Sequence, residues 1–149
     1  MKKLLVLLAI ISLLLCACGS GRDLEYGIWK DTMAAFGNGN YQILHGYRNG
    51  EDINILYNCK HKQEVMSNVE NYAQKENYVF FVGRFRRQKV FCKLNTETNL
   101  LSYYVEENSD EFFMAGIEKL IEDKQIELLP SFDAFSDEDR LEFERLTND

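Results

Sequence analysis

The segment of residues 78–83 constrains the fold of this chain most, because an extended strand there would be apolar on both faces. Its side chains are Tyr78, Val79, Phe80, Phe81 and Val82. A strand of this composition has no polar face to turn toward solvent, so both of its faces have to be covered. We therefore predict a central strand that is buried on both sides.

Further strands are predicted where apolar residues alternate with polar ones. They span residues 41–47, 53–57, 89–94 and 100–105. Asn49-Gly50 separates the first two and is typical of a two-residue hairpin turn, in which both central positions need positive φ. Short connections also link 78–83 to the two strands that follow it, so we expect an antiparallel meander of these three strands.

Helices are predicted where apolar residues recur at helical spacing. The segments are 23–36, 62–75, 109–123 and 137–146. Ser109 and Ser136 are candidate N-caps of the last two helices. We expect the last helix to be held by contacts of Phe135, Leu141 and Leu146. The predicted order is α-β-β-α-β-β-β-α-α, an α+β fold in which helices cover one face of a mostly antiparallel sheet of about five strands.

The N-terminus carries the clearest functional signal. Lys2 and Lys3 precede an apolar stretch from residue 4 to residue 15 that only Ser12 interrupts. Its length matches the core of a signal peptide and is below the roughly 20 residues that a membrane-spanning helix needs. The end of the stretch, Leu15-Cys16-Ala17-Cys18, resembles the lipobox of bacterial lipoproteins, in which an aliphatic residue and two small residues precede the lipidated cysteine.

This resemblance covers about the first 20 residues and does not extend into the rest of the chain. It implies cleavage before Cys18 and a diacylglyceryl group on the Cys18 thiol. Residues 1–17 would be the signal peptide, 18–22 a lipidated flexible tether, and 23–149 a single domain. Because each buried acyl CH₂ contributes about 0.8 kcal/mol, the lipid would hold the protein on a bilayer. We expect a location in the cell envelope, outside the cytoplasm.

The net charge of the chain limits the classes of partner that it can bind. The chain has 17 basic and 24 acidic residues, a net charge of −7, and removal of Lys2 and Lys3 with the leader would make it more negative. Nucleic-acid-binding domains are usually basic, so we expect no nucleic-acid partner. One basic cluster stands out against this acidic background: Arg84, Arg86, Arg87 and Lys89. It is either a site for an anionic ligand or partner, or a hairpin turn kept soluble by its charges.

Cys59 and Cys92 remain after the leader is removed. Exported compartments permit disulfides, and a bridge between them would close a loop of about 34 residues and contribute about 3–4 kcal/mol. Two free thiols are the alternative, because Cys92 shares the apolar face of a predicted strand with Val90 and Leu94. The two histidines and these cysteines lack zinc-site spacing, so we expect no metal and no other cofactor.

No catalytic residue is predicted. The sequence contains neither a Gly-x-Ser-x-Gly nucleophile turn nor a glycine-rich phosphate loop. Its acidic runs lie at predicted helix starts, where carboxylates stabilise the helix dipole. We therefore expect a non-enzymatic, membrane-anchored envelope binding module, for example one that acts as an immunity protein or inhibitor. The alternative is a membrane-tethered binder of, or enzyme for, a small molecule or cell-wall fragment.

Overall fold

The computed structural model describes residue 27, residues 29–106 and residues 111–149, and strands dominate it up to residue 105. Four strands come first: β1 (Thr32–Phe36), β2 (Tyr41–Arg48), β3 (Glu51–Asn58) and β4 (Gln63–Met66). Four more follow: β5 (Asn68–Lys75), β6 (Tyr78–Phe85), β7 (Gln88–Asn95) and β8 (Leu101–Val105). The chain then forms α2 (Glu111–Glu122), β9 (Ile126–Leu128), the short 3₁₀ helix η1 (Phe132–Ala134) and α3 (Asp137–Asn148).

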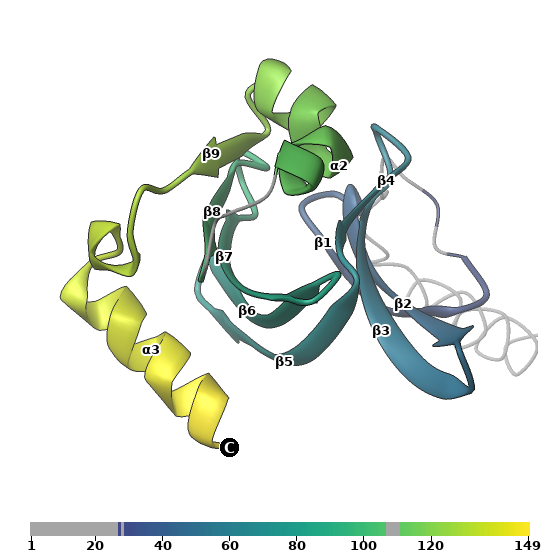
Figure 1. The fold of residues 1–149 in the computed structure, drawn as a ribbon, viewed down its shortest axis with the longest axis horizontal. Helices are drawn as coiled ribbons and strands as arrows, with labels where there is room; N and C mark the ends of the chain where they lie inside the picture. Colours follow the sequence, from purple (N-terminus) through teal and green to yellow (C-terminus); the bar gives the residue numbers. More distant parts are fainter. Residues whose placement is uncertain (1–26, 28, 107–110) are drawn as a thin grey trace, which may run out of the picture.

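These strands form two sheets whose order follows the chain. Strands β1 to β4 make an antiparallel four-stranded sheet, called sheet A here, and β5 to β9 make a five-stranded one, called sheet B. Only the last pair, β8 with β9, is parallel. The two sheets curve around a common interior, α2 lies across one end of it, and α3 lies outside sheet B on the side away from sheet A (Figure 1).

The predicted α+β fold with one sheet of about five strands is therefore wrong. Segment 62–75, predicted as a helix, forms β4 and β5 with only Ser67 between them. The apolar spacing wrongly indicated a helix because the chain changes sheets at Ser67 and β5 has a bulge between Val69 and Asn71. Each irregularity shifts the alternation of a strand by one residue and so imitates a helical period.

The first predicted helix, residues 23–36, is also wrong where the structure describes it. Residues 32–36 form β1, which pairs with β2 and has an irregular register between Thr32 and Ala34. Residues 23–26 and 28 lie outside the described residues. Pairing with a neighbouring strand overrides the weak helical preference of these five residues.

The hairpin and the meander are confirmed. β2 and β3 pair in register through the turn at Asn49 and Gly50, whose φ angles of 54° and 90° are the positive values that such a turn needs. Strands β6, β7 and β8 pair in sequence, with Phe81 opposite Cys92 and Cys92 opposite Tyr103. Alternation together with turn chemistry located these strands correctly.

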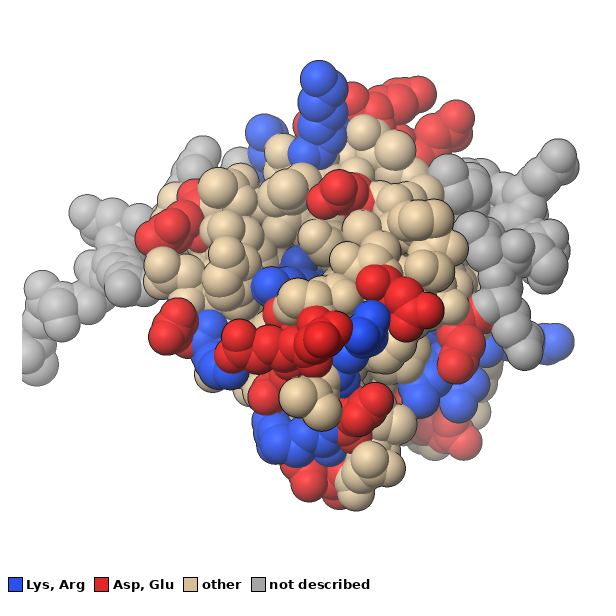
Figure 2. Space-filling view, turned by 90° about the vertical axis from the view of Figure 1, so that its left-hand side faces the viewer, with Lys and Arg blue, Asp and Glu red and all other residues tan. Residues whose placement is uncertain are grey.

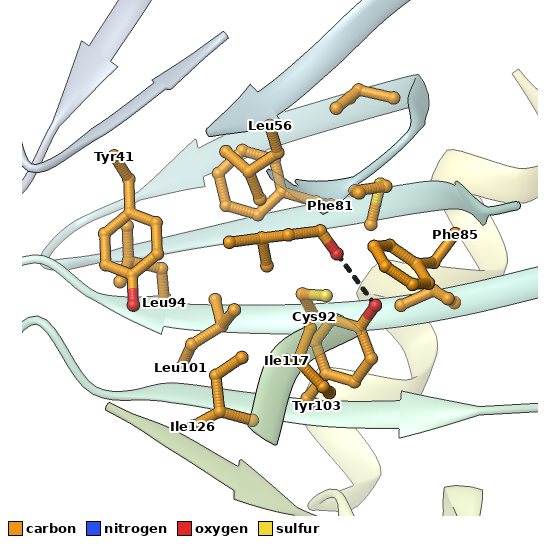
Figure 3. Packing of buried hydrophobic residues seen from close by; sticks show 14 of the residues in the cluster. Tyr41, Leu56, Phe81, Phe85, Cys92, Leu94, Leu101, Tyr103, Ile117 and Ile126 are labelled. Atoms are coloured by element: carbon orange, nitrogen blue, oxygen red, sulfur yellow. Dashed lines mark hydrogen bonds between the residues drawn. The ribbon is translucent and has the colours of Figure 1, made fainter. Parts of the chain in front are cut away.

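Two hydrophobic clusters hold the molecule together, one on each face of sheet B. The inner cluster fills the space between the sheets and under α2, where Ile117 and Leu120 are fully buried (Figure 3). Tyr103 of β8 lies in this cluster, and its hydroxyl donates a hydrogen bond of 2.8 Å to the backbone carbonyl of Val65 in β4. This buried bond links the two sheets directly.

The outer cluster lies between sheet B and α3. Phe80 and Val82 of β6 contribute to it, whereas Val79 and Phe81 point to the inner cluster, so the predicted burial of this strand on both faces is confirmed. Phe135 and Leu146 are buried as expected, but the predicted contact of Leu141 is wrong, because that side chain is 65% exposed. Its place is taken by Phe143, two residues later on the helix, which is completely buried.

The N-cap of α3 is confirmed, since the Ser136 hydroxyl accepts a hydrogen bond from the Asp139 backbone N–H. The other predicted cap, Ser109, lies outside the described residues. None of the helices in the described part of the chain has the length and hydrophobicity of a membrane span.

Candidate functional site

The basic cluster predicted from the sequence lies at the β6–β7 hairpin. Arg84 and Lys89 are opposite one another on β6 and β7, and the other two arginines form the turn. Arg84 Nε is 2.8 Å from Glu70 Oε1 of β5. The Arg86 backbone N–H donates to the Ser67 hydroxyl, and its guanidinium lies 5.4 Å from the ring centre of Phe85. Arg84 also donates from its Nη1 to the backbone carbonyl of Arg87 at 3.5 Å, so Arg84 and Arg86 contact different residues.

Lys89 has a different environment from the arginines. Its Nζ lies 5.1 Å from the ring centre of Phe91, and no described carboxylate is within ion-pair distance of it. Lys89 is one of the residues that line a cleft of about 330 Å³ between sheet B and α3. The other lining residues are Phe91, Tyr104, Glu106, Phe132, Glu144, Thr147 and Asn148.

Three aromatic rings form the floor of this cleft, which we call the α3 cleft. Phe91 and Tyr104 are opposite each other on β7 and β8, with ring centres 6.2 Å apart. Phe132 of η1 lies over both rings, at 4.8 Å from Phe91 and 5.9 Å from Tyr104. The backbone N–H of Leu129 donates to the Tyr103 carbonyl, which holds the chain beside sheet B just before η1.

The C-terminal half of α3 forms the polar wall of the α3 cleft. The Thr147 hydroxyl donates a hydrogen bond to the backbone carbonyl of Phe143, and the side-chain amide of Asn148 donates one to the backbone carbonyl of Glu144. The amide oxygen of Asn148 and the Glu144 carboxylate remain as acceptors in the lining that they share with Lys89. An apolar floor with a few polar groups at its edge is the usual composition of a binding pocket.

The position of this wall depends on contacts at both ends of α3. Near its N-terminus, Lys93 Nζ of β7 lies 2.8 Å from both carboxylate oxygens of Asp139 and 4.3 Å from the ring centre of Tyr78. Near its C-terminus, the Asn71 side-chain amide donates to the Leu146 carbonyl at 3.1 Å. Acidic and basic side chains alternate over this face rather than forming one charged patch (Figure 2).

Both cysteines of the domain are free in the structure. Cys92 is completely buried on the inner face of β7, and Cys59 is partly buried in the turn between β3 and β4. Burial raises the pKa of both thiols above the ordinary value, which disfavours the reactive thiolate near neutral pH. Among the described residues, no group of three or more His, Cys, Asp or Glu side chains is placed to hold a metal ion.

His61 and His45 lie in different environments. The side chain of His61 is mostly buried beside the end of α2, with its Nδ1 3.2 Å from Asp123 Oδ2, and this burial lowers the pKa of the imidazole. His45 is half exposed, with its Nε2 3.5 Å from Asp52 Oδ1. Cys18, the candidate lipidation site, lies outside the described residues.

Sequence reasoning identified one edge of the α3 cleft, Lys89, and missed most of the rest. The alternation of β7 and β8 places Phe91 and Tyr104 on the face that carries Lys89, and this signal was available. No local pattern shows that Phe132 folds back over these rings. The chain matches no protein-family model, no curated protein and no solved structure, so its function has to be inferred from this geometry.

Proposed function

We propose that this protein is a lipid-anchored, non-enzymatic binding module of the bacterial cell envelope, and that it holds its partner in the α3 cleft. The lipobox-like segment that ends at Cys18 supports the anchor. The observation that carries the binding role is the aromatic floor of the cleft beside Lys89, whose ammonium has no described carboxylate partner.

This arrangement suits a partner that combines an apolar or ring-shaped group with one hydrogen-bond acceptor for Lys89, because the Glu106 and Glu144 carboxylates in the same lining disfavour a partner with excess negative charge. Phe91, Tyr104 and Phe132 offer ring faces and edges on which such a group can pack. Lys89 then supplies one charge-assisted hydrogen bond to that acceptor. Of the basic residues in the predicted cluster, Lys89 is therefore the one we assign to binding.

The volume of the cleft favours a second candidate ligand alongside an envelope protein. At about 330 Å³ it is at the small end of the range for sites that enclose a whole small molecule. It could hold one ring of a cell-wall fragment or one side chain of a protein partner. The same lysine and the same floor would serve either ligand, so a single set of variants tests both.

The experiment uses the full chain, expressed with its leader in a bacterium. Mass spectrometry of the N-terminal peptide and a Cys18→Ser variant test the anchor. Lys89→Gln tests the cleft, and Lys124→Gln makes the same charge change at an exposed position beyond α2. Membrane extracts and soluble cell-wall digests are each offered to the wild type and to both variants.

We expect a specific protein or fragment to bind the wild type and Lys124→Gln, and to bind Lys89→Gln at least about tenfold more weakly, since a charge-assisted hydrogen bond contributes 1.5–3 kcal/mol. Binding that is equal for all three proteins, or absent from both extracts, would contradict the proposed role of the cleft. An unmodified Cys18 would contradict the anchor alone.

A further inference from the structure

The outer face of sheet A, turned away from the inner cluster, is a second apolar surface. Leu44 lies opposite Ile55, and Gly46 lies opposite Ile53, so all four residues share one side of the β2–β3 pair. Their neighbours in sequence, Ile43 and Leu56, point inward and are buried, whereas Leu44, Ile53 and Ile55 are partly exposed.

Gly46 flattens this face. A Cβ atom at Gly46 would lie 3.3 Å from Ile55 Cδ1 and 3.5 Å from Ile53 Cγ1, so the two isoleucines lie across the position where a side chain would project. Beside them, the ring of Trp29 packs on that of Tyr57 with the centres 5.3 Å apart. Trp29 is 49% exposed.

The described helices pack elsewhere on the molecule. α2 contacts β4 and β9, and α3 contacts β5, β6 and η1. Gly27 and Trp29 lie at the edge of this face. The Gln42 side-chain amide donates to the Gly27 carbonyl at 3.0 Å, and the Trp29 backbone N–H donates to the Thr32 hydroxyl.

The distance along the chain from Gly27 to Cys18 limits where an anchor can lie. Eight residues lie between them, so the nine steps from Cys18 to Gly27 span at most about 30 Å even when fully extended. A lipid on Cys18 is therefore held within that radius of sheet A. Helix α3, which forms one wall of the α3 cleft, lies beyond sheet B on the side away from sheet A (Figure 1).

We propose that the outer face of sheet A rests on the lipid–water interface of the membrane that holds the anchor. This inference rests on the lipidation of Cys18 in the proposed function and adds an orientation to it. Tryptophan and tyrosine favour the headgroup level of a bilayer, and Trp29 and Tyr57 lie together beside the aliphatic patch. The α3 cleft then faces away from the membrane, where an envelope partner can reach it.

The charged side chains beside the outer face of sheet A indicate which kind of lipid surface this face can contact. Glu51 and Asp52 lie at the β2–β3 turn, and Arg48 is already paired with Glu64 at 3.0 Å. These side chains offer no excess positive charge to anionic headgroups, so we expect the contact to depend on apolar and aromatic groups. Vesicles of zwitterionic phosphatidylcholine are therefore the appropriate probe.

Trp29 provides the measurement, because it is the only tryptophan in the chain. The lipidated full chain is placed in phosphatidylcholine vesicles with or without bromine on the acyl chains, which quenches nearby tryptophan. A matched variant, Trp29→Phe with Tyr104→Trp, moves the reporter into the α3 cleft. Circular dichroism checks that this variant keeps the fold, and mass spectrometry checks the lipid on Cys18.

We expect brominated lipid to lower the emission of Trp29 by about twofold or more and to leave the tryptophan at position 104 unaffected, since only the first reporter would lie at headgroup depth. Quenching at position 104 alone, or equally at both positions, would overturn the orientation. No quenching at either position would show that the face is held off the bilayer and is covered by something else.

A chain that carries no lipid on Cys18 would overturn both the anchor and this orientation, yet it would leave the Lys89 test of the cleft intact. A lipidated chain with no quenching of Trp29 would overturn the orientation alone. The two proposals can thus fail separately.

Discussion

The outer faces of the two sheets are both apolar, but only one is covered by a described element. Phe80, Val82 and Phe91 of sheet B lie under α3 and η1. Leu44, Ile53 and Ile55 of sheet A have no helix over them among the described elements and stay partly exposed. An apolar strand face is costly to leave in water, and among the described elements only the face of sheet B has such a cover; in the proposed orientation the face of sheet A rests on a membrane.

The covered face also shows how little apolar contact can hold a helix. Seven of the twelve residues of α3 are charged, and its buried contacts come mainly from Phe143 and Leu146. A helix this short and polar is marginal on its own, so docking on sheet B supplies most of its stability. Four predictions test this comparison, in order of expected effect.

The largest effect is expected from Phe143→Ala. Phe143 is completely buried and its ring lies 5.4 Å from Phe80 and 5.5 Å from Phe91. Truncating a buried phenylalanine lowers the free energy of unfolding by about 3–5 kcal/mol, which urea denaturation measures. Leu141→Ala on the same helix is the control and should change it by less than about 0.5 kcal/mol. Equal effects of the two changes would contradict the docking of α3.

A smaller effect is expected from the ion pair that positions α3. Replacing either Lys93 or Asp139 leaves its partner charged in a mostly buried position. We expect Lys93→Met or Asp139→Leu to cost about 1–3 kcal/mol in the free energy of unfolding. The double variant should be more stable than the sum of the two single losses implies. Strict additivity in this double-mutant cycle would show that the two side chains do not interact.

A pH effect is expected from His61, where a turn of sheet A meets α2. Burial lowers the pKa of this imidazole in the folded protein, and the unfolded value is about 6.5. The His61 contribution is therefore complete above pH 6.5 and is lost as the pH falls from there toward the lower folded pKa. The slope cannot exceed about 1.4 kcal/mol per pH unit, the value for one proton.

Denaturation at pH 7 and pH 5.5 measures this contribution, and His61→Gln should reduce the difference between the two values. The neighbouring charges are Asp123, which favours the protonated imidazole, and Lys60 and Lys119, which oppose it. An unchanged difference in the variant would mean that other groups cause the pH dependence.

The smallest effect is expected from reductant. A bridge between Cys59 of the β3–β4 turn and Cys92 of β7 would join the two sheets covalently, whereas the structure has both thiols free. Dithiothreitol should therefore leave the midpoint of thermal unfolding unchanged after purification from an exported compartment. A bridge would instead make reduction cost about 3–4 kcal/mol. Thiol counting under denaturing conditions, with two free groups expected in the domain, gives an independent reading.

Parts of the fold were predictable because local chemistry determines them. Asn49-Gly50 selects a tight turn, and the alternation around it locates β2 and β3 within a residue or two. The double apolar pattern of β6 predicted that both of its faces are covered. These features depend on residues that are neighbours in the sequence.

The division into two sheets was not predictable in the same way, because it depends on a close approach between distant residues. A Cβ atom at Gly83 would lie 2.2 Å from the backbone oxygen of Asn68 and 2.5 Å from Met66 Sδ. Only glycine at this position of β6 lets the chain cross from β4 to β5 so near to it. The sequence shows a glycine in a strand but not the segment that it accommodates.

The α3 cleft was hidden for a related reason. Its floor joins a cross-strand pair, Phe91 and Tyr104, to Phe132, a residue that is distant in sequence. The sequence predicted a site at the basic residues of the β6–β7 hairpin, arginines included, yet Arg84 forms an ion pair with Glu70. Only the tertiary structure separates the lysine at the cleft from the arginines at the turn.

The edge strands of the two sheets affect how the protein would behave at high surface concentration. Lipid-anchored chains share a two-dimensional surface, where an exposed strand edge can pair with the edge of a neighbour and begin aggregation. One edge of sheet B ends in β9, a strand of only three residues, and the β1 edge of sheet A is interrupted by an irregular register at Thr32. Short or irregular edges are poor templates for pairing, so with the proposed anchor these two edges would give neighbouring molecules on a membrane little to pair with.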